Sequence, residues 1–183
     1  SMGSIGVLSF HATKCLTTGE GGMLVTKNPE MIEKARAIRD GSQNLLRRVP
    51  APLSDLQAAL GISQLDRYGV FLNKRKQIQK EYYKVISDKL GWVSGIFDRD
   101  FLYRFVMKNN GGFGLISKQF GVSNVCVRRG VDSLLHREMS LPDEQFKNAV
   151  SLYNRTVSVP FYPALTESEI GRVCDALSSI SRD

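Results

Sequence analysis

A single lysine, Lys14, lies near the start of the chain in a stretch of hydroxyl groups and glycines between Ser9 and Gly22. Apolar runs flank this stretch at 5–8 and 23–26, which predicts a β-hairpin or strand–loop–strand element with buried strands. Lysine is mostly exposed in proteins. An amine that packing and nearby groups keep neutral becomes a nucleophile that forms a Schiff base with a carbonyl compound. The competing interpretation is a solvated lysine in an ordinary loop, because short motifs often match by chance.

Other side chains that commonly do chemistry are sparse. The three cysteines, Cys15, Cys126 and Cys174, form no CxxC pair, and no histidine cluster accompanies them. Neither a zinc site nor a disulfide framework is therefore expected. Cys15 follows Lys14, but the sequence places no base beside it, which favours a small packing residue. This cysteine usage fits a reducing, cytoplasmic compartment.

The composition excludes several classes of protein. The chain has 183 residues, 42% apolar and 23% charged, which is ordinary for a soluble globular protein, and its net charge is +7. Basic residues are densest at 74–84, and we interpret them as a solvated helix face, because no nucleic-acid-binding motif accompanies them. Positive surroundings would also suit a diphosphate-linked ligand. No apolar run is long enough to span a membrane, and residues 1–8 do not resemble a signal peptide. Neither nucleic acid nor a membrane is an expected partner.

The stretch around Lys14 has a more specific pattern as a whole. Residues 9–22 read S-F-H-x-x-K-x-L-T-x-G-E-G-G. This string resembles the lysine motif of the DegT/StrS-type nucleotide-sugar aminotransferases, which are fold-type I enzymes that use pyridoxal 5′-phosphate (PLP). The resemblance implies that Lys14 binds PLP as the internal aldimine and that Ser9 contacts the cofactor phosphate.

A second stretch, residues 53–65, is similar to the small-residue helix that this family has at its subunit interface. Ser54 and Gln57 form a capping-box pattern at its start. Alanines and a glycine within it permit close approach of another element. A plain packing helix is the alternative, and both interpretations can hold together. The resemblance makes a homo-oligomer the expected assembly.

The rest of the chain alternates between helical and extended patterns. Helices are predicted at 29–40, 54–65, 67–89, 115–120, 142–153 and 167–180, and strands at 101–107, 124–129 and 156–159. This order predicts an α/β chain. By resemblance it is the C-terminal part of a PLP-transferase fold: the tail of the large domain at 1–70, then a linking helix and a small α+β domain at 71–183.

PLP chemistry also needs an acid against the pyridine nitrogen, a stacked aromatic ring and a phosphate cradle. The family carries these upstream of its lysine, so we expect a fragment without the N-terminal cofactor-binding half, inactive in isolation. The family's asparagine that reaches the phosphate of the neighbouring subunit is replaced by Pro50–Pro52, with Asn44, Arg47 or Arg48 as candidate substitutes. His136 matches a substrate-facing family histidine weakly, and the alternative is a surface histidine.

The predicted function is transfer of an amino group from a donor, expected to be glutamate, to a keto group on a nucleotide-linked sugar. Lys14, once freed, would move the proton between donor and cofactor. Such enzymes serve cell-envelope polysaccharide biosynthesis. The alternative is a non-catalytic remnant or oligomerisation module of the same family. A related sugar dehydratase is disfavoured, because those proteins resemble the family with histidine in place of the lysine.

Overall fold

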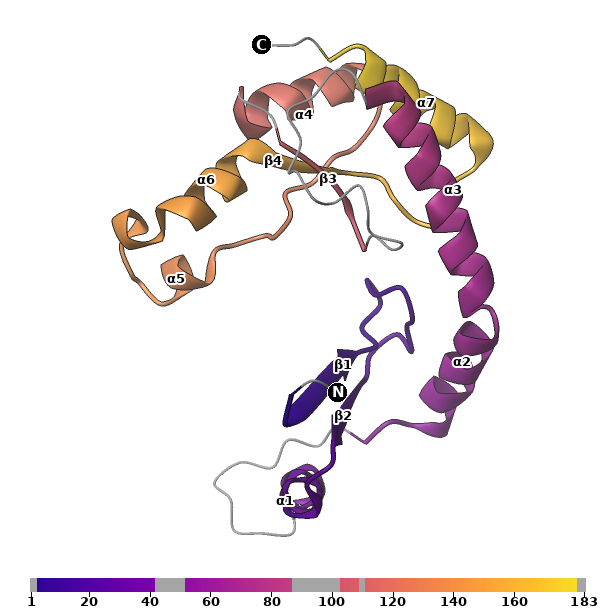
Figure 1. Cartoon of the computed structure of the whole chain (residues 1–183), viewed down its shortest axis with the longest axis vertical. Coiled ribbons are helices and arrows are strands. Elements are labelled where there is room, and N and C mark those ends of the chain that lie inside the picture. Colours follow the sequence, from indigo (N-terminus) through magenta and orange to yellow (C-terminus); the bar gives the residue numbers. More distant parts are fainter. Residues whose placement is uncertain (1–2, 42–51, 87–102, 109–110, 181–183) are drawn as a thin grey trace. The chain divides into compact units, whose positions relative to one another are not determined.

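The computed structural model describes residues 3–41, 52–86, 103–108 and 111–180 (Figure 1). The chain divides into two compact units, Ser1–Phe71 and Leu72–Asp183, which we call the first and the second unit. That these are the tail of a large domain and a small domain stays a prediction.

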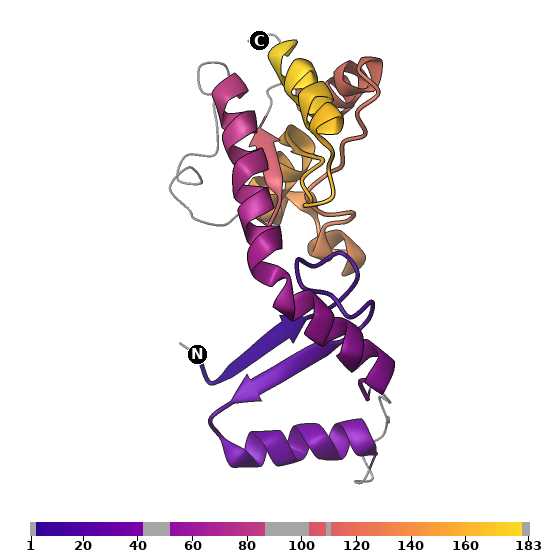
Figure 2. The ribbon, with the colours of Figure 1, turned by 90° about the vertical axis from the view of Figure 1, so that its right-hand side faces the viewer.

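A β-hairpin forms the centre of the first unit. Strands β1 (Ile5–Ser9) and β2 (Gly22–Thr26) pair antiparallel, with Val7 opposite Leu24 (Figure 2). The predicted hairpin is confirmed. The expectation of buried strands is wrong: every residue of both strands is exposed or half-buried, and Val7 is 80% exposed. A two-stranded sheet is too small to cover its own apolar faces.

Two capped helices follow the hairpin. Helix α1 (Pro29–Asp40) begins at Asn28, whose side chain accepts hydrogen bonds from the first-turn amides, and ends at Gly41, with a φ of 68°. That left-handed conformation is one that glycine adopts without steric cost. Helix α2 (Asp55–Asp66) begins with the predicted capping box. Both helix starts are therefore confirmed.

Helix α3 (Tyr68–Ile86) begins in the first unit and continues into the second. Its predicted last residues, 87–89, lie outside the described residues. The second unit then contains a two-stranded antiparallel sheet, β3 (Phe105–Lys108) and β4 (Thr156–Val159). The helices of this unit are α4 (Gly112–Val122), α5 (Leu135–Glu138), the 3₁₀ turn η1 (Asp143–Phe146), α6 (Lys147–Arg155) and α7 (Glu167–Ser178).

A single cluster of buried side chains holds the second unit together. It joins α3, α4 and α7 to both strands, with Tyr82, Phe105, Phe120 and Leu177 at its centre. The rings of Tyr82 and Phe105 meet edge to face, with centroids 5.1 Å apart. The Tyr82 hydroxyl donates to the carbonyl of Pro160 over 2.8 Å, which satisfies its only polar group. Burial also raises the pKa of this hydroxyl.

Residues 124–129 are a correction to the predicted elements. They were expected to form a strand, but they make only one isolated bridge, between Arg128 and Ser158. Asn124 has a φ of 54°, so the chain turns immediately after α4. Val125 and Val127 are buried, and their alternation with exposed residues produced the strand-like pattern.

Three other elements exist where predicted but have different bounds. The helix expected at 142–153 is interrupted, because Phe146 has a non-helical backbone (φ −124°, ψ 35°) between η1 and α6. The strand expected at 101–107 begins at Phe105, and residues 101–102 lie outside the described part of the chain. Helix α4 extends the predicted 115–120 at both ends.

The first test concerns the hydrogen bond of the Tyr82 hydroxyl in the core of the second unit. Tyr82→Phe removes the donor and leaves the carbonyl of the half-buried Pro160 without that partner. We expect the free energy of unfolding to fall by about 1 kcal/mol. Urea unfolding followed by circular dichroism measures this change. Tyr162→Phe is the matched control, because Tyr162 is 46% exposed. Equal stability of the two variants would contradict this account.

Candidate active site

The residues that join β1 to β2, 10–21, carry Lys14, and we call them the lysine loop. Backbone hydrogen bonds close the loop at its base: the Phe10 amide donates to the Gly21 carbonyl over 2.8 Å, and the Thr18 amide donates to the Phe10 carbonyl over 2.9 Å. Within the loop, the Lys14 amide donates to the carbonyl of His11 over 2.9 Å. Lys14 is half-buried. It therefore occupies a turn whose ends are fixed by the hairpin.

Ser9 is the last residue of β1, at the base of the same loop. Its hydroxyl oxygen accepts a long hydrogen bond of 3.4 Å from the His11 amide, and the residue is exposed. The structure thus places both sequence-predicted residues, Ser9 and Lys14, on one segment of the first unit. The Ser9 hydroxyl proton is left to donate to an anionic ligand.

The side chains of His11 and Glu20 face each other across the lysine loop. His11 Nε2 lies 3.5 Å from Glu20 Oε1, and both side chains are largely exposed. His11 Nδ1 lies 3.0 Å from the hydroxyl oxygen of Thr13. An exposed pair of this kind contributes little stability. Glu20 therefore faces His11 in solvent, and it does not form the buried acid that would hold a pyridine nitrogen.

The loop also contacts α2, which sequence reasoning missed. The Gln57 side chain donates from Nε2 to the Glu20 carbonyl over 2.9 Å, and Thr18, only 5% exposed, donates to the same carbonyl over 2.7 Å. A Cβ atom added at Gly61 would lie 2.9 Å from Thr18 Cγ2. The capping box marked Gln57 as a helix-start residue, but no sequence signal linked it to the loop.

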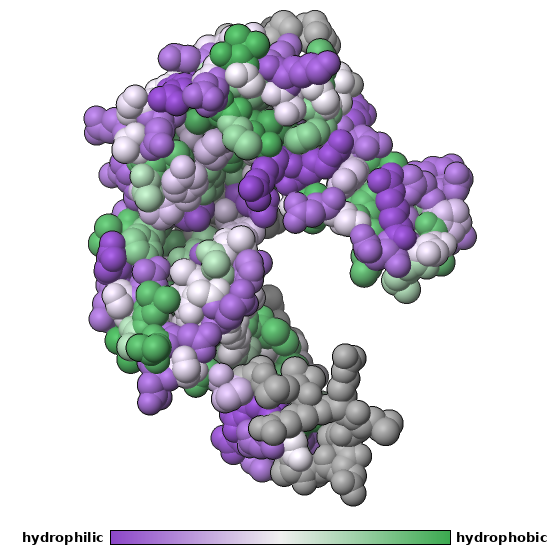
Figure 3. All heavy atoms as spheres, turned by 180° about the vertical axis from the view of Figure 1, so that it is seen from behind, coloured by the Kyte–Doolittle hydropathy of each residue, from purple (hydrophilic) through white to green (hydrophobic). Residues whose placement is uncertain are grey.

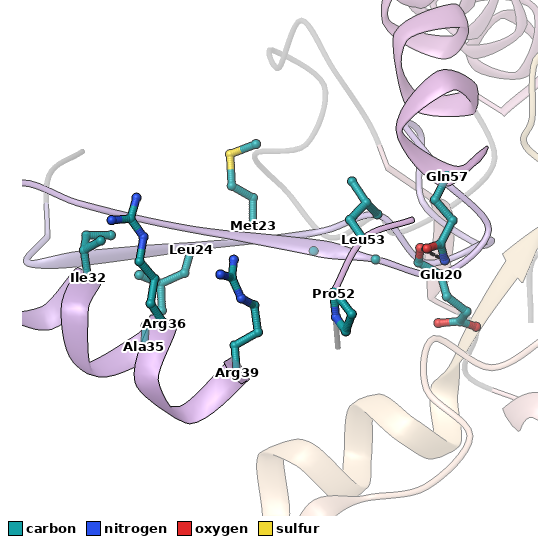
Figure 4. A pocket seen from close by; sticks show the side chains of 12 residues that line it. Glu20, Met23, Leu24, Ile32, Ala35, Arg36, Arg39, Pro52, Leu53 and Gln57 are labelled. Carbon is teal, nitrogen blue, oxygen red and sulfur yellow. Dashed lines mark hydrogen bonds between the residues drawn. The ribbon is translucent and has the colours of Figure 1, made fainter. Parts of the chain in front are cut away.

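A cavity of about 720 Å³ lies beside the loop in the first unit (Figure 4). Its walls are apolar residues of β2, of α1 and of the segment just before α2, together with Glu20, Gln57 and two arginines, Arg36 and Arg39, that rise from α1. Arg39 forms a two-point ion pair with Asp40, at 2.7 and 3.0 Å, and Arg36 pairs with Glu33 at 3.0 Å. Neighbouring carboxylates thus balance both cations. Lys14 does not line the cavity, although Glu20 and Gly21 of the lysine loop do.

His136 belongs to a different cluster, in the second unit. Its ring is 6% exposed, stacks on Phe146 at a centroid distance of 4.3 Å, and places Nε2 2.9 Å from Asp143 Oδ1. Arg137 also binds Asp143 through Nε and Nη2. Together Arg137 and His136 hold the pKa of the Asp143 carboxyl far below its usual range. The surface-histidine alternative is therefore wrong, while contact of His136 with substrate stays a prediction.

The structure does not place the candidate phosphate contacts at 44–50. Asn44, Arg47, Arg48 and Pro50 lie outside the described residues. The three cysteines are unpaired with one another. Across residues 3–41, 52–86, 103–108 and 111–180, no group of three or more histidine, cysteine or acidic side chains could hold a metal ion. In the same ranges no helix has the length and apolarity to cross a membrane.

The lysine loop fits part of a PLP site. PLP carries an aldehyde and a phosphate. The loop carries the amine of Lys14, and the adjoining end of β1 presents the exposed hydroxyl of Ser9. Because Glu20 is exposed against His11, the loop supplies an attachment point and a phosphate partner without a partner for the ring nitrogen.

Comparison with known proteins places this loop in a family. A model of the DegT/DnrJ/EryC1/StrS aminotransferase family matches residues 1–96. The spore coat polysaccharide biosynthesis protein SpsC of Bacillus subtilis is 24% identical over 211 residues, covering 98% of this chain and 54% of SpsC. The chain thus spans about half the length of the curated relatives it matches.

Solved structures share the fold. The PMP form of the putative sugar aminotransferase Spr1654 from Streptococcus pneumoniae has a TM-score of 0.80 at 18% identity, covering 98% of this chain and 51% of that one. DesI, solved in the presence of its TDP-sugar product, has a TM-score of 0.78 at 24% identity, with coverages of 97% and 50%. The predicted fold class, α/β with part of a PLP-transferase fold, is confirmed. With its lysine motif on a closed hairpin loop and over half of its residues matched by the family model, the chain belongs to the DegT/DnrJ/EryC1/StrS aminotransferase family.

Proposed function

We propose that this chain supplies the lysine-bearing part of a PLP-dependent aminotransferase that acts on a keto group of a nucleotide-linked sugar. The observation that carries the proposal is the position of Lys14, half-buried in a loop closed by hydrogen bonds and set in the family's motif. The TDP-sugar product of DesI and the polysaccharide role in the name of SpsC support the substrate class. The net charge of +7 suits a diphosphate-linked substrate.

The site residues have different tasks in this proposal. PLP, when bound, supplies an electron sink for the substrate's reacting carbon. The Lys14 amine holds the cofactor covalently and, once displaced, moves a proton at the α-carbon of the amino donor, for which glutamate is our candidate. The Ser9 hydroxyl donates to a phosphate oxygen. His136 is a weaker candidate for contact with the sugar.

A second candidate function is self-association through α2. The apolar residues of this helix are spread around its circumference instead of gathering on one face. Its leucines and isoleucine are exposed, by 86% at Leu56, 63% at Ile62 and 60% at Leu65. Hydrophobic atoms gather on the part of the surface that α2 forms (Figure 3). Contiguous apolar surface of this kind marks interaction sites. The two functions are compatible, because one chain can be both an aminotransferase part and a subunit of an oligomer.

The first prediction concerns covalent attachment of the cofactor. We expect PLP followed by borohydride to label Lys14 in preference to the exposed Lys27 of the same unit, as read by peptide mass spectrometry. Lys14→Ala should abolish the PLP-dependent absorbance change, whereas Lys27→Ala should retain it. In the complete enzyme, which includes the N-terminal cofactor-binding half, Lys14→Ala should lower turnover by about 10²-fold or more.

Two outcomes would contradict the aminotransferase assignment. One is equal labelling of Lys14 and Lys27 in the unmodified chain. The other is full transaminase turnover by the Lys14→Ala variant. Unselective labelling together with self-association would favour the non-catalytic module instead.

The second prediction concerns assembly. We expect the chain to sediment as an oligomer, and Leu56→Lys to shift it toward the monomer, because a charge would then have to be buried in the contact. Val122→Lys, at the end of α4, is the matched control, since Val122 is 91% exposed and lies on a different helix. A strictly monomeric profile of the unmodified chain at high concentration would overturn the role given to α2.

A further inference from the structure

The side chain of Gln57 uses both ends of its amide at once. Its Oε1 accepts from the amide of Ser54 over 2.9 Å and lies 3.0 Å from the Ser54 hydroxyl, which completes the capping box of α2. Its Nε2 donates to the carbonyl of Glu20 over 2.9 Å. One residue therefore joins the start of a helix to the lysine loop, 37 positions earlier in the chain. Figure 4 shows the Gln57 amide beside Glu20.

The Glu20 carbonyl is the acceptor on the loop side. It also accepts from the hydroxyl of Thr18 over 2.7 Å, so two donors meet at one oxygen. The backbone amide of Thr18 in turn donates to the Phe10 carbonyl, at the base of the loop. A continuous series of hydrogen bonds thus runs from the start of α2 to the end of β1.

A packing contact reinforces this series one helical turn further along α2. Gly61 lies four residues after Gln57, on the same face of the helix. An added Cβ at Gly61 would lie 2.9 Å from the methyl carbon of Thr18, closer than such contacts normally come. The glycine therefore leaves room for Thr18, a residue only four positions after Lys14.

Glutamine at position 57 distinguishes two roles of this side chain, capping the start of α2 and binding the lysine loop. A glutamate there would complete a capping box equally well, because the box needs only a side-chain acceptor. Glutamine alone offers an acceptor to the helix start and a donor to a carbonyl at the same time, since an ionised carboxylate has no N–H. The helix start does not explain the donor, whereas contact with the loop does.

We propose that Gln57 is a positioning residue for Lys14: its Nε2 hydrogen bond to the Glu20 carbonyl holds the lysine loop on α2 and so fixes where the lysine amine lies. This inference rests on the proposed function, in which Lys14 carries PLP. Loops are ordinarily mobile, and covalent chemistry at a lysine is sensitive to displacements of about 1 Å. The Glu20 carbonyl, two residues before the start of β2, gives the loop an anchor on α2 in addition to the backbone bonds at its base.

Gln57→Glu tests the proposal in the full chain, because it keeps the cap acceptor and removes the donor. We expect amide hydrogen exchange at Thr18 to accelerate by about two- to tenfold. Exchange at Ala58, whose amide donates to the Ser54 carbonyl in α2, should not change. In PLP–borohydride labelling, the ratio of adduct at Lys14 to adduct at Lys27 should fall by a similar factor.

Two control variants separate positioning from helix stability. Ser54→Ala weakens the cap but leaves the Gln57 donor, so exchange at Ala58 should accelerate while the labelling ratio at Lys14 stays unchanged. Gln64→Glu makes the same chemical change on α2 at a side chain without a hydrogen bond in the described part of the chain, and it should alter neither readout.

The outcomes distinguish the two proposals. Selective labelling of Lys14 in the unmodified chain, with unchanged labelling in Gln57→Glu, would overturn the positioning role and leave the proposed function intact. The same conclusion would follow if exchange at Thr18 changed but the labelling ratio did not. Unselective labelling in the unmodified chain would overturn the proposed function and, with it, the role of Gln57. A fall in the ratio for Gln57→Glu alone supports the proposal.

Discussion

The first unit depends on hydrogen bonds at the lysine loop more than on a hydrophobic core. Its two strands leave their apolar side chains exposed or half-buried, and α1 and α2 contain no fully buried residue. What fixes the loop is polar: the Phe10–Gly21 and Thr18–Phe10 backbone bonds, and the two donors on the Glu20 carbonyl. Hydrogen bonds are directional, so this construction determines the position of a side chain more narrowly than non-directional apolar contacts would.

The second unit has the opposite construction. Its buried cluster of aromatic and aliphatic side chains joins three helices to a small sheet. Arg75, a cation that is only 7% exposed, also contacts this core. It donates from Nη1 to the carbonyls of Tyr103 and Phe161, and its guanidinium carbon lies 5.2 Å from the centroid of the Phe161 ring. The His136–Asp143–Arg137 cluster is likewise internal to this unit. The position of its elements is therefore set by apolar packing, which the first unit lacks.

Local signals predicted much of this structure, and long-range contacts account for the errors. The helix starts at Asn28, Ser54 and Thr166 were all readable, because a cap and the amide it binds are at most three residues apart. The pattern at 124–129 was misread, because alternating burial looks the same whether or not a neighbouring strand continues the pairing. The surface alternative for His136 was wrong for the same reason: its partners Asp143 and Phe146 reach it only through the turns between α5 and η1. The hydrogen bond between Gln57 and Glu20 joins residues 37 positions apart, and the helix and strand periodicities of a sequence do not predict contacts at that separation.

The exposure of the first unit also bears on the chemistry of Lys14. A lysine acts as a nucleophile and base when water is kept from it, and charged transition states are stabilised most strongly by preorganised dipoles in a dry site. Here Ser9, His11 and Glu20 are all exposed around the loop, while Leu8 and Met23 present apolar surface nearby on the adjoining strands. A surface that covered those strands would also exclude water from the amine. If Lys14 has the proposed function, its chemistry would need a contact over the hairpin that excludes water, and the hydrogen bonds to α2 would order the loop before this contact forms.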